Sequence, residues 1–325
     1  MAISKLTGFE LAGAIIVMPS NKEDNSDLED FSNFEKEQLI LHTGIKFRRV
    51  AGSNDPIKDY FRMGISSLLT QLNWSPSEID LLICVTQTKE TPIPSFSCIL
   101  HGELNFLQHT LCFDMNSGCS GYVYGLHTVM SLLNSLANPN AKAIICCGDL
   151  SSQLINRKDK SSLPIFSDAI SVTGISRSDN EKTSFFNLET DGSGRKAIFV
   201  ENNFMQLNGI DVFNYSLKLV PNHLKDLFHA AKIKNPEKEV LIFHQANKLI
   251  NDALVKRLQL NPANVPSTLY EYGNTASASI PLTLGCFYQN LTSPQVILCG
   301  FGVGFSLASA VVHLSPQYSF KIIEI

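Results

Sequence analysis

The sequence predicts an α/β protein whose strands are buried between helices and whose two halves interlock. Short apolar runs rich in β-branched residues alternate with stretches of helical periodicity along the chain. These runs are continuous and do not alternate with polar residues, which is typical of strands covered on both faces. No low-complexity linker separates independent domains. We therefore divide the chain at a polar connector into an N-terminal half, residues 1–175, and a C-terminal half, residues 176–325.

Each element is expected from its local pattern. Continuous apolar runs predict strands at residues 81–85, 143–147, 197–200, 240–243 and 296–299, and a shorter strand at 111–115. Apolar residues at helical spacing predict helices at residues 120–136, 212–231, 246–260 and 276–288. The polar, acidic residues 20–33 are expected to form a surface loop, and residues 158–160 and 176–183 polar connectors.

Composition excludes several classes of function. The formal net charge of −4 does not favour nucleic-acid binding, which calls for clustered Lys and Arg. No apolar stretch reaches the ~18 residues of a membrane span, and the first residues lack a basic signal-peptide region. None of the eight cysteines forms a C-x-x-C pair, so a zinc site is not expected. We therefore expect a soluble, cytoplasmic protein without a metal, a nucleic-acid partner or a membrane span.

The first segment with chemical potential surrounds Cys119. Residues 114–122 read Asp-Met-Asn-Ser-Gly-Cys-Ser-Gly-Tyr, a glycine-containing turn between a short strand and a helix. A thiol at a helix N-terminus feels partial positive charge, which predicts a lowered pKa and a reactive nucleophile. A buried structural cysteine beside a glycine turn explains the same residues equally well.

Three further segments carry candidate groups. His244 ends an apolar strand just before a helix, where side chains often reach a cleft, although a lone histidine is more often part of the core. Residues 273–281, Gly-Asn-Thr-Ala-Ser-Ala-Ser-Ile-Pro, open a helix, and Asn274 or its neighbour is equally suited to cap it. Residues 299–306, Cys-Gly-Phe-Gly-Val-Gly-Phe-Ser, favour a loop whose backbone N–H groups form an oxyanion hole or the wall of a channel.

Together these segments resemble β-ketoacyl-acyl-carrier-protein synthase III, a decarboxylating condensing enzyme of the thiolase superfamily. The resemblance extends over nearly the whole chain and includes residues 42–45 with Arg48-Arg49 after them, 166–169, 191–194 and 208–213. His-Gln-Ala-Asn at residues 244–247 combined with residues 273–281 is its most specific part. The resemblance implies a thiolase-like five-layered αβαβα fold with two pseudo-symmetric halves and a homodimer.

The resemblance also implies the role of each site residue. Cys119 would be the acylated nucleophile, while His244 and Asn274 would hydrogen-bond the thioester carbonyl of a malonyl extender. Backbone N–H groups of Cys119, Val303 and Gly304 would form the oxyanion hole for carbon–carbon bond formation. No cofactor is implied; the substrates would be acyl-CoA or acyl-carrier-protein thioesters and malonyl-acyl-carrier protein, and the partner would be acyl carrier protein.

The sequence departs from the family at several places. Gln38 and His42 stand where enzymes primed by acyl-CoA carry a Trp that stacks on adenine and an Arg. Ile93 stands where short-chain enzymes place a Phe from the dimer partner in the acyl pocket. Phe166 is followed by Ser-Asp-Ala-Ile-Ser rather than Gly-Asp-Gly-Ala-Gly. These changes predict a specialised member of the family, with a longer or branched acyl group and weak handling of CoA. Carrier-protein contacts are expected at Gln245, Lys248, Lys256 and Arg257, with Lys248 displaced by one position.

Other functions fit part of the pattern. A thiolase-fold acyltransferase would pass the acyl group from Cys119 to oxygen or nitrogen without releasing CO2. A papain-like cysteine hydrolase also presents Cys, His and Asn in this order, but its local signature around the nucleophile is absent. An inactive binding partner would not need all three side chains. We therefore favour the condensing enzyme.

Overall fold

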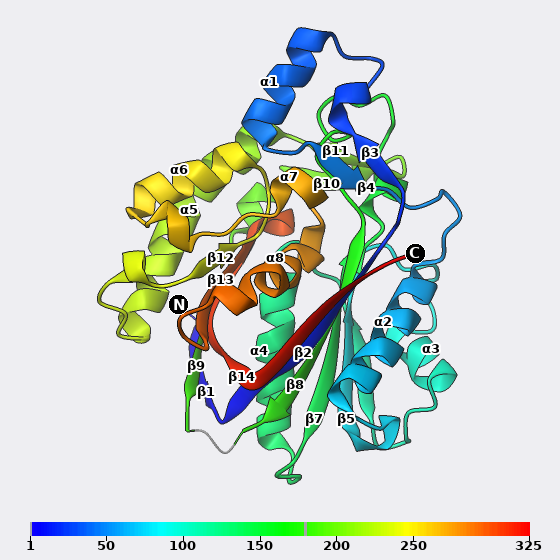
Figure 1. Ribbon diagram of the computed structural model, residues 1–325, viewed down its shortest axis with the longest axis vertical. Coiled ribbons are helices and arrows are strands. Elements are labelled where there is room, and N and C mark those ends of the chain that lie inside the picture. Colours follow the sequence, from blue (N-terminus) through cyan, green and yellow to red (C-terminus); the bar gives the residue numbers. More distant parts are fainter. Residues whose placement is uncertain (1, 179–180) are drawn as a thin grey trace.

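Two β-sheets lie between three layers of helices in the computed structural model, which describes residues 2–178 and 181–325 (Figure 1). Helices α2 (Ile57–Leu72) and α3 (Phe96–Glu103) form one outer layer. Helices α4 (Gly121–Ser135) and α8 (Ser279–Phe287) lie between the sheets, and α5 (Gly209–Ala230) and α6 (Lys248–Leu258) form the other outer layer. This is the predicted five-layered αβαβα order.

One long strand, β14 (Ser306–Glu324), belongs to both sheets. Its first part pairs with β13 (Gln295–Phe301) and β9 (Thr183–Thr190), and its last part pairs with β2 (Phe9–Met18). The first sheet has the order β12 (Leu241–Phe243), β13, β14, β9, β1 (Ala2–Thr7). The second has the order β14, β2, β8 (Ala169–Arg177), β7 (Lys142–Asp149), β5 (Ile79–Val85), β6 (Leu111–Met115).

Hydrophobic cores fill the space around the central helices and beneath each outer layer of helices. The central core contains the buried Val129 and Met130 of α4, a helix that contacts both sheets, and the outer cores contain Phe61 on α2 and Leu224 on α5. α4 lies close to the second sheet because two of its residues are glycines. A Cβ at Gly121 would stand 2.6 Å from Val85, and a Cβ at Gly125 would stand 2.2 Å from Ile145. Burial on both faces explains why the strands read as continuous apolar runs.

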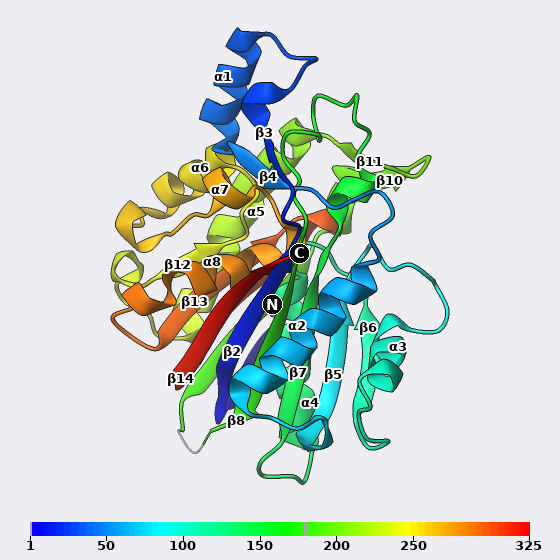
Figure 2. The ribbon, with the colours of Figure 1, turned by 45° about the vertical axis from the view of Figure 1, so that its right-hand side comes forward.

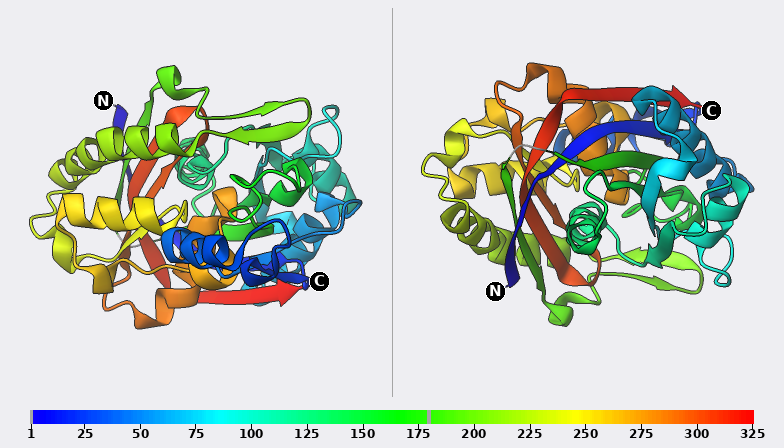
Figure 3. Two further views of the ribbon diagram at one scale, coloured as in Figure 1. Left: turned by 90° about the horizontal axis from the view of Figure 1, so that it is seen from above. Right: turned by 90° about the horizontal axis from the view of Figure 1, so that it is seen from below.

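The predicted strands and helices all occur, with small shifts at their ends. Two differences are informative. The strand predicted at residues 197–200 is β10 (Ile198–Glu201), which forms a separate hairpin with β11 (Phe204–Leu207) beside the layers (Figure 3). The helix predicted at residues 276–288 starts as a 3-10 turn (Ala276–Ala278) and becomes α-helical at Ser279.

The predicted surface loop at residues 20–33 is wrong in part. Residues Lys22–Asp24 form strand β3, which pairs with β4 (Phe47–Arg49), and Asn25 is fully buried. Within this segment Glu23 and Asn25 accept hydrogen bonds from the buried guanidinium of Arg48, whereas Asp27, Glu29 and Asp30 are exposed. After it, α1 (Asn33–Thr43) projects from the molecule, capped by Ser32, and no residue of this helix is buried (Figures 1 and 2).

The connector predicted at residues 176–183 is shorter than expected. Ser176 and Arg177 end β8, Thr183 begins β9, and residues 179 and 180 lie outside the described residues. The division into residues 1–175 and 176–325 stays a prediction. Strand pairings cross this division, because β1 pairs with β9 and β2 pairs with β14. Among the described residues, no helix is long and apolar enough to cross a membrane.

Candidate active site

Cys119 lies in the turn between β6 and α4 and is buried by a loop from the other end of the chain. This loop follows β13. A Cβ at Gly302 would stand 2.8 Å from the sulfur of Cys119, and a Cβ at Gly300 would stand 2.7 Å from the Cα of Ser120. Real Cβ atoms do not approach so closely, so both glycines are needed for the loop to cover the nucleophile.

The predicted lowering of the Cys119 pKa is wrong. Burial raises the pKa of this thiol to about 12, although hydrogen bonds from the backbone of Val303 and of Cys119 itself act in the opposite direction. The negative charge of buried Asp149 raises it further. Desolvation penalises the thiolate more than the two backbone contacts stabilise it. Those contacts nevertheless bring the predicted oxyanion donors, the N–H groups of Cys119 and Val303, to the sulfur.

His244 follows β12 directly and is held by both its backbone and its ring. Its N–H donates to the carbonyl of Cys299 at 2.8 Å, and its ring Nδ1 lies 2.8 Å from the hydroxyl of Ser279. Burial lowers the pKa of the imidazole to about 3. The ring is therefore neutral at neutral pH and is suited to donate a hydrogen bond without transferring a proton.

Asn274 follows Gly273, whose positive φ of 61° turns the chain toward the site. Its backbone N–H donates to the carbonyl of Ile165 at 3.0 Å. Its side-chain Oδ1 accepts the backbone N–H of Ala276 at 3.0 Å, and its Nδ2 donates to the carbonyl of Ala246 at 3.3 Å. Because Oδ1 is already bonded, the amide orientation is fixed, and the second hydrogen on Nδ2 remains available as a donor.

One cavity brings these groups together. Cys119, His244, Asn274 and Val303 all line one cleft. Its remaining wall is mainly apolar and includes residues of the β10–β11 hairpin; the apolar side chains are Leu154, Ile165, Phe166, Ile198, Met205, Leu207, Val212, Ile250 and Phe301. Gly304 lines a neighbouring cavity that Val303 also borders, and its predicted part in the oxyanion hole stays a prediction. The candidate nucleophile and the two candidate donors thus share a largely apolar cleft.

Comparison with known proteins assigns the chain to a family. The family model described as 3-Oxoacyl-[acyl-carrier-protein (ACP)] synthase III matches residues 113–193, and the model of its C terminal part matches residues 228–314. A Campylobacter jejuni protein with the provisional name 3-oxoacyl-[acyl-carrier-protein] synthase 3 is 30% identical, over 97% of this chain and 96% of its own. The chain belongs to the 3-oxoacyl-[acyl-carrier-protein] synthase III family.

Further relatives agree with this assignment. Beta-ketoacyl-[acyl-carrier-protein] synthase III of Lactobacillus helveticus is 27% identical over 95% of this chain and 99% of its own. The crystal structure of 3-oxoacyl-(acyl-carrier protein) synthase from Burkholderia xenovorans has a TM-score of 0.94 at 28% identity, covering 99% of both chains. The predicted thiolase-like fold and the predicted condensing enzyme of the acyltransferase class are confirmed.

In this synthase III chain, three of the four side chains predicted to contact the carrier protein are exposed and one is buried. Gln245 is 1% exposed; its Nε2 donates to the carbonyl of Phe243, and its Oε1 accepts from Ser267 and Thr268. The prediction for Gln245 is wrong, because this side chain stabilises the turn after β12. Lys248, Lys256 and Arg257 are exposed on α6, and Lys248 is paired with Asp252 one turn along the helix.

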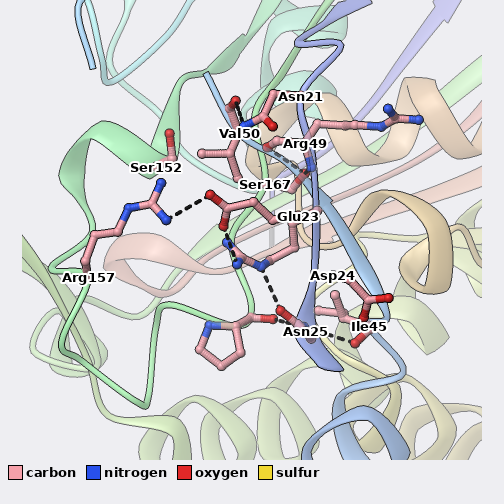
Figure 4. Close-up of polar contacts among 12 residues, drawn as sticks. Asn21, Glu23, Asp24, Asn25, Ile45, Arg49, Val50, Ser152, Arg157 and Ser167 are labelled. Atoms are coloured by element: carbon pink, nitrogen blue, oxygen red, sulfur yellow. Dashed lines mark hydrogen bonds and ion pairs between the residues drawn. The ribbon is translucent and has the colours of Figure 1, made fainter. Parts of the chain in front are cut away.

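A buried polar network behind the site was not predicted. Arg48 is 2% exposed; its guanidinium donates to Glu23 at 2.8 Å and to Asn25 at 2.9 Å. Asn25 in turn donates to the carbonyl of Pro164 at 2.9 Å, and Glu23 also binds Arg157 (Figure 4). The adjacent Arg48-Arg49 pair was part of the family resemblance, but nothing in the sequence linked it to residues 23–25.

This network supports the backbone that carries Asn274. It fixes Pro164, and two residues further on Phe166 forms an isolated parallel bridge with Asn274. Ser167 continues the connection: its N–H donates to the carbonyl of Asn274 at 2.9 Å, and its hydroxyl accepts the N–H of Arg49 at 2.7 Å. Ser167 thus has a defined role in this family member where the resemblance leads one to expect glycine.

Two predictions concern groups outside the cavity. Ile93 is 83% exposed and does not line the cleft in this single chain. Among the described residues, no group of three or more His, Cys, Asp and Glu side chains is placed to hold a metal ion.

Proposed function

We propose that this synthase III enzyme takes an acyl group onto Cys119 and condenses it with a malonyl thioester. The cavity shared by Cys119, His244 and Asn274 is the observation that carries the proposal. In the first step the sulfur of Cys119 attacks the carbonyl carbon of the acyl donor. A new carbon–sulfur bond forms, the donor's carbon–sulfur bond breaks, and the donor thiol leaves with the proton of Cys119.

The second step needs hydrogen-bond donors rather than a group that gives up a proton. The malonyl thioester loses CO2, and the electron pair of the broken bond moves toward the thioester oxygen. Neutral His244 and the free hydrogen on Asn274 Nδ2 would stabilise this enolate in a dry site. The enolate carbon then attacks the acyl carbonyl, whose developing charge meets the N–H groups of Cys119 and Val303. The Cys119 thiolate leaves and is regenerated.

The release of CO2 tests this function. Enzyme preloaded with an acyl group is mixed with malonyl-acyl carrier protein in a single turnover. One CO2 and one 3-oxoacyl product are expected for each acyl group lost from Cys119. The alternative acyltransferase predicts loss of the acyl group to an alcohol or amine acceptor without CO2, and that result would overturn the condensing reaction.

We also propose that carrier protein is the preferred acyl donor. Gln38 and His42 lie on α1, the projecting helix, where the resemblance leads one to expect the adenine-stacking Trp and its Arg. A base stacked on an aromatic ring contributes about 1–3 kcal/mol, so its loss would weaken CoA binding about fivefold to 150-fold. Lys248, Lys256 and Arg257 present positive charge on α6 for an acidic carrier.

The donor preference is measured by loading one acyl group from two carriers. We expect faster acylation of Cys119 from acyl-carrier protein than from acyl-CoA at low micromolar concentration. The Gln38→Trp variant should narrow the difference by improving loading from CoA alone, while Gln289→Trp, a distant surface substitution, should not change it. Faster loading of the unchanged enzyme from CoA would show that the missing stack does not matter.

The enzyme is proposed to be a homodimer. Strand β6 is the last strand of the second sheet and pairs with β5 along one edge, leaving its other edge for a partner. Leu111 on this strand is 49% exposed, and Ile93 lies in the loop before α3, the helix packed on β6. Sedimentation at micromolar concentration should give twice the chain mass; a monomer alone would contradict the proposal.

The departures from the family pattern support a specialised biosynthetic role. Gln38, His42 and Ile93 each replace a residue expected in a general initiator of fatty acid synthesis. We place the enzyme in the cytoplasm, where its cysteines would stay reduced; all eight are free thiols in the structure. Intact-mass analysis with a panel of acyl donors would identify the primer, and exclusive loading of acetyl groups would argue against specialisation.

A further inference from the structure

We propose that the acyl group accepted by Cys119 carries a hydroxyl on its third carbon and that Gln87 recognises this hydroxyl. The inference rests on the proposed function of Cys119 as the acylated nucleophile. It names the class of primer, a short 3-hydroxyacyl group, and a specificity residue that the family resemblance does not supply.

The first observation is where Gln87 lies. Two cavities meet beside Cys119, and Gln87, Gly118 and Val303 line both. The first cavity contains His244 and Asn274, whereas the second does not and is lined instead by residues of the turn before the nucleophile, including Asn116 and Ser117. An acyl chain on Cys119 must leave room for the malonyl group at His244 and Asn274. The side of the cleft bordered by Gln87 is therefore suited to the acyl chain.

The second observation is that the Gln87 amide is held against the nucleophile's neighbour. A Cβ at Gly118 would stand 2.9 Å from Gln87 Oε1 and 3.0 Å from a methyl group of Val303. Gly118 thus makes space for this amide directly before Cys119. Gln87 Nε2 donates to Asn116 Oδ1 at 3.1 Å, which fixes which end of the amide faces Gly118. Among the described residues, no donor is bonded to Oε1, so it remains an acceptor.

The third observation is a set of buried contacts that holds Gln87 in place. Asp149 is 3% exposed, and its Oδ1 accepts the backbone N–H of Gln87 at 2.6 Å. The same oxygen accepts the hydroxyls of Thr86 at 3.0 Å and Thr88 at 3.2 Å. Asp149 Oδ2 has no partner within the described part of the chain. The backbone of Gln87 is therefore anchored at a polar edge of an otherwise apolar cleft.

These contacts favour an acyl group with a hydrogen-bond donor. Covering an acceptor with methylene groups removes its water and leaves it without a partner, which is unfavourable. A hydroxyl on the chain would donate to Gln87 Oε1 and restore the lost bond. Because Oε1 lies beside Gly118, immediately before the acylated residue, the hydroxyl must stand within a few bonds of the thioester. The third carbon satisfies this condition.

The test compares two acyl groups of the same shape. The 3-hydroxybutanoyl and 3-methylbutanoyl groups differ by a hydroxyl against a methyl group. Both are supplied as N-acetylcysteamine thioesters, so that neither CoA nor carrier protein affects the result. We expect the (R) or the (S) hydroxy thioester to load Cys119 about fivefold to tenfold faster, the size expected for one hydrogen bond between neutral groups. Intact mass reports the adduct over time.

The Gln87→Leu variant tests whether the preference for the hydroxy thioester depends on the Gln87 side chain. Gln87→Leu should remove the preference or reverse it while still loading 3-methylbutanoyl, and Gln289→Leu, the same change on a distant surface, should leave it unchanged. Thermal unfolding checks that each variant is folded. The unchanged enzyme gives the decisive comparison even if Gln87→Leu does not fold.

Each outcome has a separate meaning. Equal or faster loading of 3-methylbutanoyl by the unchanged enzyme would overturn the inference and leave the proposed condensing function standing. A preference for the hydroxy group that persists in folded Gln87→Leu would overturn the role of this residue. Loading of none of these groups, nor of acetyl or butanoyl, from N-acetylcysteamine or from acyl carrier protein would contradict the acyl-enzyme itself and this inference with it.

Discussion

Replacing His244 or Asn274 with alanine is expected to slow malonyl decarboxylation about 10²–10³-fold while Cys119 is still acylated. In the proposed mechanism each side chain donates one hydrogen bond to the enolate oxygen, and losing one oxyanion donor typically has this effect. Neither side chain is hydrogen-bonded to the Cys119 sulfur in the structure; that sulfur is contacted by backbone N–H groups of Val303 and Cys119. Acyl transfer to the thiol should therefore proceed without either donor.

The reciprocal variant separates the two half-reactions. Cys119→Ala should abolish the acyl adduct but retain some decarboxylation of the malonyl thioester, because His244 and Asn274 stay in place. Adducts are measured by intact mass and decarboxylation by CO2 release. Asn264→Ala, which removes a surface amide bonded to the carbonyl of Glu237, is the matched control for Asn274→Ala. Equal loss of acylation in all three folded variants would refute this division of labour.

Local sequence predicted where the candidate site lies because Cys119 and His244 each stand next to the end of a regular element. The apolar strand before His244 and the glycine turn before α4 can each be recognised from a short stretch of neighbouring residues. In the structure both lead to the same cavity. Asn274 gave a weaker signal, since the same residue type caps helices. In the structure Asn274 instead follows a turn at positive-φ Gly273, and its side-chain oxygen accepts the N–H of Ala276.

What the sequence did not predict depends on partners that are distant along the chain. Glu23 and Asn25 looked like loop residues because their partner, Arg48, is more than twenty positions away and buried with them. Strand β14 gave no sign that it would serve two sheets, because its separate pairings are set by β9, β13 and β2. Burial of Gln245 followed the same pattern, since Ser267 and Thr268 accommodate its amide.

The pKa of Cys119 is the clearest case in which packing outweighs local sequence. The helix that begins at Gly121 led to the expectation of a lowered pKa, because the charge of a helix end acts within the first turn. The covering loop with Gly300 and Gly302 removes water from the thiol, and this desolvation raises the pKa to about 12. The reactivity of the nucleophile therefore depends on pH in a way that the motif alone did not reveal.

Acylation of Cys119 is expected to accelerate about tenfold per pH unit between about pH 7 and pH 9, a hundredfold in total. The thiolate is the attacking species, and below a pKa of about 12 its fraction rises tenfold for each unit of pH. Rapid quenching and intact mass measure the rate, with donor hydrolysis without enzyme subtracted. The decarboxylation step should show no such slope: burial lowers the His244 pKa to about 3, so the ring stays neutral from about pH 5 upward. An ordinary histidine would instead lose its neutral form as pH falls through about 6.5. If the acylation rate stops rising before the pH reaches about 8, a pKa well below 12 governs the thiol. If the decarboxylation rate falls to half as the pH is lowered to about 6.5, His244 has an ordinary pKa.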